Sequence, residues 1–229
     1  MQTIPHRHSR SIPVEDTTAN LPQAGPHAIV SSIAKKALRS HIRSVRRQRG
    51  ADARKAAAEG FACRSAEVIR VARQVTPEGA VPVVLAYCAA DTEPDVALAM
   101  RSLHDAGLRV AVPRSLPDAC MSWVRWHPDL EMTTGSVAPV PEPVGGEELE
   151  LPTHPMVVVL PALAVDGAGL RLGQGGGFYD RFVETLPAGS VLVAAVFEDE
   201  VYPTGEVPAE PWDAVADYVW TPHNLHPLR

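Results

Sequence analysis

The chain has 229 residues, and its 45% hydrophobic and 21% charged residues indicate a globular protein that buries a sizeable core. This composition excludes a disordered or fibrous chain, and no apolar run is long enough to predict a membrane span. The net charge of −6 hides an uneven distribution: residues 35–73 hold twelve Lys or Arg and three acids, whereas residues 74–229 hold seven and twenty-two. A basic segment beside an acidic body therefore needs an explanation.

The first 30 residues are rich in Pro, Ser, Thr and His and lack the apolar stretch of a secretion signal. We therefore expect residues 1–30 to form a flexible extension. The three cysteines, Cys63, Cys88 and Cys120, are odd in number and form no CxxC pair, which is typical of free thiols in a reducing compartment. A cytoplasmic protein with no membrane partner is predicted, with a monomer as the default state.

Two helices are predicted after the extension. From residue 31 onward, apolar residues recur at helical spacing at Ile33, Leu38, Ile42 and Val45. After Gly50, a second helix rich in Ala and Arg is expected to run to about residue 73, with Asp52 as its capping residue.

The rest of the chain alternates short apolar runs with helical patterns. Strands are predicted at residues 81–88, 108–114, 121–126, 156–163, 191–197 and 215–220, the second of them ended by its proline. Helices are predicted at 94–107, with Pro94 in the first turn and Gly107 at the C-terminal end, and at 178–186. Because such alternation is typical of parallel sheets, we predict one α/β domain over residues 31–229, with a mostly parallel sheet flanked by helices.

The strongest chemical signal is RLGQGGGFYDRF, from Arg171 to Phe182. Its glycines allow sharp backbone bends and free N–H groups for anionic oxygens, and a helix that begins near Phe178 adds a positive end. The segment lacks the GK[ST] ending of a Walker loop and the final glycine of the dinucleotide fingerprint. It predicts a phosphate site, while a structural hinge between strand and helix is the alternative.

Two acids could serve this predicted phosphate site. Asp180 lies just inside the short helix, where a carboxylate can hold Mg²⁺ while phosphates and waters complete the octahedron, or can simply stabilise the helix start. Asp213 precedes the last strand and could reach the same sheet edge, although alone it would be an ordinary loop acid. Phe178 and Tyr179 offer flat surfaces for a base or a pteridine ring, or else pack in the core.

The basic helix is the second signal. Lys35, Lys36 and Arg39 lie within about one turn and could meet a triphosphate, the alternative being a solvated basic helix. Nucleic acid is not expected as a partner, because the basic segment holds one aromatic residue, Phe61, and the rest of the chain is acidic.

Polar side chains also follow the first strand, at the edge where open α/β sheets bind ligands. They are Tyr87, Cys88, Asp91, Glu93 and Asp95. Glu93 could accept hydrogen bonds from amino or amide groups of a ligand, or could cap the next helix. An acidic loop broken by Pro and Gly, residues 139–155, could pass over the same site.

Together these residues resemble the 5-formyltetrahydrofolate cyclo-ligase family, the methenyltetrahydrofolate synthetases, over most of the chain after residue 34. The most specific match is L-P-x-L-A-x-D-x-x-G-x-R-L-G-x-G-G-G-x-Y-D-R. Shorter matches are K-x-x-L-R from Lys35, Y-x5-E from Tyr87, V-P-R from Val112, P-E-P from Pro141, Phe197–Glu198, and Asp213. The resemblance implies a NagB/RpiA/CoA transferase-like fold and a ligase that uses ATP and Mg²⁺ to convert 5-formyltetrahydrofolate to 5,10-methenyltetrahydrofolate.

The resemblance also implies roles for individual residues, with Arg171 and Tyr179 as catalytic residues and Asp180 and Asp213 as Mg²⁺ ligands. The implied ATP contacts are Lys35, Lys36, Ala37, Leu38, Arg39, Arg171, Leu172, Gly173, Gln174, Gly175, Gly176, Gly177, Phe178 and Tyr179. The implied folate contacts are Cys88, Glu93, Gln174, Gly175, Gly176, Gly177 and Phe178.

Three positions depart from the family pattern. Val96 stands where a threonine is usual, Glu200 where a glutamine is common, and Phe178 where a tyrosine is usual. Val96 and Glu200 motivate an alternative, a non-catalytic protein that binds or sequesters folate in the same site. A further alternative is another enzyme of this fold, such as a sugar-phosphate isomerase, against which the Gly-rich loop followed by Y-D-R argues.

Overall fold

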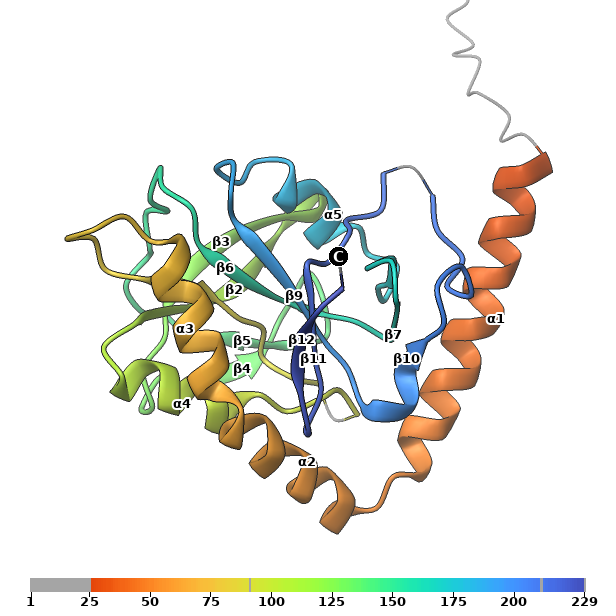
Figure 1. Ribbon diagram of the computed structural model, residues 1–229, viewed down its shortest axis with the longest axis horizontal. Coiled ribbons are helices and arrows are strands. Elements are labelled where there is room, and N and C mark those ends of the chain that lie inside the picture. The colour runs from red at the N-terminus through yellow and green to blue at the C-terminus, as the bar shows by residue number, and fades with distance from the viewer. Residues whose placement is uncertain (1–25, 91, 211, 229) are drawn as a thin grey trace, which may run out of the picture.

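The computed structural model describes residues 26–90, 92–210 and 212–228 and is built around a seven-stranded sheet in the order β12-β11-β9-β6-β1-β2-β3 (Figure 1). Its strands are β1 (Val83–Leu85), β2 (Arg109–Leu116), β3 (Cys120–Arg125), β6 (Val157–Pro161), β9 (Val191–Ala195), β11 (Tyr218–Trp220) and β12 (Leu225–Pro227). The five central strands run parallel, and the edge strands β12 and β3 are antiparallel. The prediction of an α/β domain with a mostly parallel sheet is confirmed.

Strands β1, β6 and β9 at the centre of the sheet are apolar throughout because each faces two cores. On β1, Val84 packs into one core, while Val83 and Leu85 point into the other, as the two-residue period of a strand requires. The helices α2 (Ala51–Cys63), α3 (Ser65–Val75) and α4 (Ala97–Asp105) cover the first face. The short helix α5 (Phe178–Val183) covers the second face, where Phe182 packs 4.9 Å from the Trp123 ring.

The prediction of one long second helix is wrong, because the segment folds as α2 and α3 with a break at Arg64. At the break, the Ser65 hydroxyl donates to the Ala62 carbonyl oxygen (2.7 Å), a local bond that competes with helical hydrogen bonding. The break allows both helices to lie on the same face of the sheet. The predicted cap is also wrong: Gly50 is the N-cap, and Asp52 lies in the first turn without a capping bond.

Two other boundaries differ from the prediction. Helix α4 begins at Ala97, after Pro94, because the Asp95 carboxylate accepts the Ala97 N–H (2.9 Å). Strand β2 continues through Pro113, where an end was predicted. The missing N–H of this proline costs little, because β1 pairs only with the first three residues of β2.

Several short strands carry too few residues to show a periodic pattern and were not predicted. They are β12 of the main sheet, the three-stranded sheet of β10 (Val201–Tyr202), β7 (Ala164–Asp166) and β8 (Arg171–Leu172), and the pair β4 (Met132–Thr134) and β5 (Pro141–Pro143). Strand β5 lies inside the acidic loop 139–155 and holds a buried carboxylate, Glu142, which accepts the Ser115 N–H (2.9 Å).

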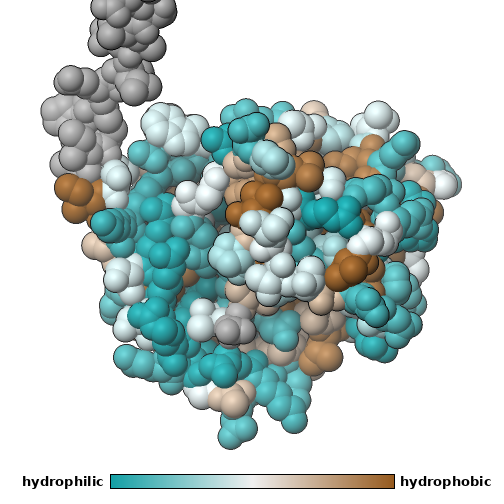
Figure 2. Space-filling view, turned by 180° about the vertical axis from the view of Figure 1, so that it is seen from behind, coloured by the Kyte–Doolittle hydropathy of each residue, from teal (hydrophilic) through white to brown (hydrophobic). Residues whose placement is uncertain are grey.

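Helix α1 (Pro26–Gln48) lies along the side of the molecule, next to β7 and β10 (Figure 1). It begins five residues before the periodic pattern starts, and the expectation for residues 1–25 lies outside the described residues. Figure 2 shows mostly hydrophilic side chains on the opposite face, with hydrophobic residues in separate patches. In the described part of the chain, no helix combines the length and the hydropathy that a membrane span requires.

Candidate active site

The described fold brings the sequence-predicted segments together around a cavity of about 390 Å³. The cavity lies beyond the carboxyl end of β1 and is bordered by the Gly-rich loop that follows β8. Its wall includes Tyr87, Cys88, Glu93, Pro113, Ser115, Met121, Pro139, Val140, Pro141, Arg171, Gly173 to Tyr179, and Asp180. The prediction that the acidic loop passes next to the site is confirmed by the residues at positions 139–141.

The loop of residues 173–177 has a backbone that only glycine adopts readily. Gly175 and Gly177 have φ angles of +102° and +71°, in the left-handed region. A Cβ atom on Gly177 would also lie 2.9 Å from the Arg181 guanidinium. Within the described residues, no N–H group of positions 174–177 donates to another protein group. The loop can therefore offer these N–H groups to an anionic ligand.

Two arginines of α1 hold this loop from outside. Arg39 donates through Nε to the Gly173 carbonyl oxygen (2.9 Å). Arg43 donates through Nε and Nη2 to Gln174 Oε1 (3.1 and 2.8 Å), and through Nη2 to the Gln174 carbonyl oxygen (3.1 Å). The Gln174 amide in turn donates to Glu93 Oε1 (2.8 Å). A continuous set of hydrogen bonds therefore joins α1 to the segment after β1.

The segments that carry the two predicted metal ligands are in contact. Asp180 Oδ1 accepts hydrogen bonds from Arg171 Nη2 (2.6 Å) and from the backbone N–H of Ala214, the residue that follows Asp213 (3.2 Å). The 33 positions that separate the two aspartates in sequence are therefore bridged by one contact.

Lys35 neutralises the second of these aspartates. Its buried Nζ lies 2.6 Å from Asp213 Oδ2 and 2.6 Å from Glu210 Oε2. Asp213 Oδ2 also accepts the Glu210 N–H (2.6 Å), which fixes the turn that carries both acids. One carboxylate oxygen of each aspartate is thus bound to a cation. The other two oxygens, Asp180 Oδ2 and Asp213 Oδ1, have no hydrogen bond to another described residue.

Two buried polar groups on the cavity wall have no partner among the described residues. They are Arg171 Nε and the Tyr179 hydroxyl. Burial raises the pKa of Tyr179, so its phenol stays protonated and remains a hydrogen-bond donor. Burial lowers the pKa of Arg171, against the opposing effects of Asp180 and Asp213, yet an arginine keeps its charge near neutral pH. Unsatisfied buried donors are costly, so these two groups are suited to a ligand.

The wall near the end of β1 is neutral or apolar except for one carboxylate. Burial, with smaller effects from Asp95 and Glu142, raises the pKa of the Cys88 thiol to about 12. The Tyr87 hydroxyl donates to the Pro94 carbonyl oxygen (2.6 Å). Glu93, which is half-buried, is therefore the charged group on this wall, and its Oε2 accepts the Ala90 N–H (3.1 Å).

A second cavity, of about 640 Å³, adjoins the first and shares part of its wall. The shared residues are Tyr87, Cys88, Ala90, Glu93 and Pro141. The second cavity is bordered by the aromatic ring of Trp126 and by two cations of α2, Arg54 and Lys55. An elongated ligand that passes Glu93 would have room on both sides of it.

Not every residue of the predicted site reaches the cavities. Lys36 and Ala37 are exposed on α1, while Leu38 and Leu172 pack into the apolar cluster around Ile42. These four residues line neither cavity, and Lys35, Arg39 and Asp213 do not line one either. Asp91 lies outside the described residues.

Sequence reasoning missed three polar residues: Arg43, Glu210 and Glu142. Arg43 could have been found, because it follows Arg39 by four residues and so lies on the same helix face. The loop positions of Glu210 and Glu142 gave no comparable periodic signal.

The two departures that motivated a non-catalytic protein lie away from the cavity walls. Val96 is the buried N-cap residue of α4. Glu200 forms a buried, two-point ion pair with Arg46 (2.7 Å for each bond). Both therefore have roles in packing, which explains how they can differ without changing the cavity.

A model of the 5-formyltetrahydrofolate cyclo-ligase family matches residues 31–222. The chain belongs to this family. Among curated members, the 5-formyltetrahydrofolate cyclo-ligase of Mycolicibacterium smegmatis is 34% identical over 146 residues, which are 61% of this chain and 73% of that protein. The enzyme of the same name from Escherichia coli K12 is 31% identical over 158 residues, 63% of this chain and 82% of that protein. As a cyclo-ligase family member, this chain is a ligase of folate metabolism.

Solved structures confirm the fold. The 5,10-methenyltetrahydrofolate synthetase of Aquifex aeolicus superposes with a TM-score of 0.68 at 22% identity, over 85% of this chain and 93% of that one. The corresponding synthetase of Mycoplasma pneumoniae gives a TM-score of 0.60 at 17% identity, over 82% and 98%. The cyclo-ligase fold is therefore shared beyond the range of close sequence similarity.

Proposed function

We propose that this cyclo-ligase family member uses ATP and Mg²⁺ to convert 5-formyltetrahydrofolate to 5,10-methenyltetrahydrofolate. The main support is the pair of unpartnered buried donors, Arg171 Nε and the Tyr179 hydroxyl, beside a glycine loop with free N–H groups and two carboxylates from segments that are in contact. We further propose that residues 31–229 form one catalytic domain that acts in the cytoplasm as a monomer.

The reaction needs little covalent chemistry from the protein. The formyl oxygen is a poor leaving group, and ATP converts it to a good one by transferring its γ-phosphoryl group to that oxygen, with release of ADP. The N-10 nitrogen then bonds to the activated carbon and loses its proton, and the oxygen departs with phosphate as the ring closes. Positioning the two substrates and neutralising the transferring phosphoryl group are the tasks left for the residues.

The cations around the loop are suited to the phosphates. We assign Lys35, Arg39 and Arg171 to the triphosphate, together with the N–H groups of residues 174–177. Arg171 and Tyr179 face the reacting groups as donors. Lys36 is exposed and contributes as a longer-range charge, while Leu38 and Leu172 contribute through the backbone positions they stabilise.

The donor set fits Mg²⁺. Asp180 and Asp213 supply two hard carboxylate oxygens from segments that are in contact, and Mg²⁺ usually takes one or two carboxylates and completes its shell with phosphates and waters. When bound, the ion would neutralise phosphate charge, and Lys35 and Arg171 would hold the two carboxylates in place.

The folate is assigned to the wall formed by Cys88, Glu93 and Phe178. Glu93 is the carboxylate available for the amino and amide N–H groups of the pterin, and the neutral Cys88 thiol gives an apolar surface beside it. The second cavity accommodates the p-aminobenzoyl ring near Trp126 and the anionic glutamate near Arg54 and Lys55.

The decisive experiment mixes the protein with 5-formyltetrahydrofolate, ATP and Mg²⁺ and follows the absorbance of methenyltetrahydrofolate. Wild-type protein is expected to form product, and Asp180→Asn to lose turnover while retaining its thermal unfolding temperature. Asp129→Asn, at an exposed site away from the cavities, is the matched control. Folate binding without any product would reject the enzyme and favour the non-catalytic folate-binding alternative.

A further inference from the structure

The set of hydrogen bonds from α1 to Glu93 determines how the Gln174 side chain is oriented. An arginine can only donate, so the two bonds from Arg43 require the amide oxygen of Gln174 to face α1. The amide nitrogen then faces Glu93 and donates to its Oε1 (2.8 Å). A rotated amide would bring a donor against Arg43 and an acceptor against a carboxylate, so this network selects one orientation.

Glu93 is thereby held at both oxygens. Oε1 accepts the Gln174 amide, and Oε2 accepts the Ala90 N–H (3.1 Å). Each carboxylate oxygen can accept a further hydrogen bond, and Glu93 lines both cavities. The carboxylate is therefore fixed before a ligand arrives, which reduces the ordering cost of binding.

We propose that Arg43 is a positioning residue for the folate, acting through Gln174 on Glu93, although it lies on the helix assigned to ATP. This inference rests on the proposed function for the identity of the ligand. Among the residues that the structure describes, Arg39, one turn earlier, bonds only the Gly173 carbonyl oxygen and has no such route to Glu93. Two neighbouring arginines of one helix therefore serve different substrates.

A second consequence is that the two substrates bind cooperatively. Arg39 and Arg43 lie on successive turns of one helix, so nucleotide contacts that fix this part of α1 also fix Gln174 and Glu93. Such coupling must be reciprocal: bound nucleotide tightens folate binding by the same factor by which bound folate tightens nucleotide binding.

The test compares Arg43→Met with Arg39→Met, and uses Arg47→Met on the exposed side of α1 as the matched control. Arg43→Met is expected to raise the KM and the calorimetric Kd for 5-formyltetrahydrofolate by roughly 3- to 10-fold, the equivalent of one ordinary hydrogen bond. Its KM for ATP is expected to stay within about twofold of wild type, with Arg39→Met showing the opposite pattern.

A double variant separates positioning from general loosening. Because Arg43 acts through Gln174, Arg43→Met combined with Gln174→Met should weaken folate binding no more than Gln174→Met alone. Additive effects, or a larger change in the ATP KM than in the folate KM, would overturn the proposal.

Failure of the proposed function is distinguishable from failure of this inference. If the protein binds folate without turnover, calorimetry still tests Arg43. If it binds no folate, the side-chain amide resonances of Gln174 test the contacts directly by NMR. Chemical shifts that move in both Arg43→Met and Glu93→Gln support the relay, and shifts that stay unchanged in either variant reject it.

Discussion

The basic residues of α1 and those of α2–α3 behave differently, although the sequence presents them as one segment. Four cations of α1 contact groups that lie 116 to 178 positions away in the chain. Those of α2, α3 and the break between them make mostly local contacts, such as Lys55 with Glu59 and Arg64 with Glu67, pairs that contribute little to stability. The exception is Arg73, which donates to the Ala106 carbonyl oxygen 33 positions away (3.3 Å). The positive charges of α1 thus mainly form tertiary contacts, whereas those of α2 and α3 mainly face solvent.

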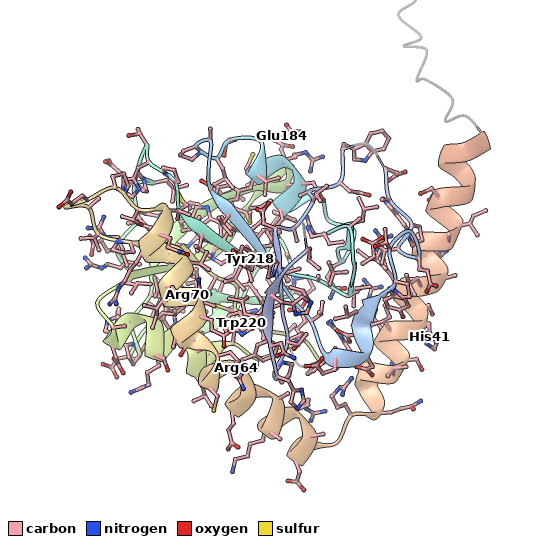
Figure 3. All side chains as sticks on the ribbon, viewed as in Figure 1. His41, Arg64, Arg70, Glu184, Tyr218 and Trp220 are labelled. Carbon is pink, nitrogen blue, oxygen red and sulfur yellow. The ribbon has the colours of Figure 1, made fainter. Side chains whose placement is uncertain are left out.

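The difference follows from spacing. The contacting cations of α1 lie within an arc of roughly 80° on one side of the helix, given 100° per residue. They are Lys35, Arg39, Arg43 and Arg46, and Arg49, just after the helix, continues the set. His41 lies on the outer side of the same helix (Figure 3). Helix α1 therefore packs on the acidic body through a polar stripe in addition to its apolar contacts at Leu38 and Ile42, whereas most surface helices use an apolar face alone. In contrast, nothing in the structure explains the exposed Arg70 of α3.

The largest expected effect comes from the buried member of this stripe. Arg46→Ala would leave Glu200 as an unpaired buried carboxylate and should destabilise the protein by about 3–5 kcal/mol. Arg70→Ala on α3 should stay within about 0.5 kcal/mol of wild type. Urea unfolding of both variants measures the contrast, and equal losses would mean that the two helices do not differ as described.

The second prediction concerns two adjacent lysines of α1. Lys35→Met should lower kcat/KM by about 10- to 100-fold, because it removes the charge that holds Asp213 and Glu210. Lys36→Met, at an exposed position with the same charge change, should alter it by less than about threefold. Initial rates over a matrix of ATP and folate concentrations decide the matter, and similar losses would point to net charge alone.

The third prediction compares Cys63, at the exposed end of α2, with Cys88 at the cavity. Burial raises the pKa of Cys88 from its ordinary value near 9 to about 12, so its thiolate is scarce at neutral pH. Iodoacetamide at pH 8 should modify Cys63 and leave Cys88 intact, as read by peptide mass spectrometry. Rapid labelling of Cys88 would contradict the buried environment.

The raised pKa of Cys88 also makes the free energy of unfolding fall as the pH rises, which is opposite to the effect of most acids. Because the folded state holds the Cys88 proton more tightly than the unfolded state, this contribution is complete below pH 9 and is lost as the pH rises toward 12. Cys88→Ser should therefore lose less unfolding free energy than the wild-type protein when the pH is raised from 9 toward 12.

The smallest expected effect belongs to α2. Replacing Arg54 and Lys55 with Met should weaken binding of a polyglutamylated folate by about two- to fivefold more than binding of the monoglutamate. The excess should shrink at high salt, because the charges are near solvent. Equal effects on both ligands would place the tail elsewhere, and α2 would then be a purely structural helix.

Sequence patterns were sufficient for the elements that carry the fold's core and for the glycine loop. Apolar runs at 81–88 and 156–163 contain the central strands, because buried parallel strands are apolar on both faces. The break at Arg64 was not predictable, since its signal is a single serine hydroxyl. The two-residue strands β8 and β10 are likewise too short for any periodicity.

For the site, sequence alone determined which residues could do chemistry: the glycine loop, Asp180 and Glu93 stand out by type and spacing. Tertiary structure alone decided which cations serve them, because a charge has no preferred partner until the chain folds. Successive residues of a helix are rotated by 100°, so once α1 packs against the body, Lys35 faces Asp213 while the adjacent Lys36 faces solvent. The same packing brings Arg43 to Gln174. The basic segment and the acidic body of the sequence thus form, in part, the two sides of the interface between α1 and the rest of the domain.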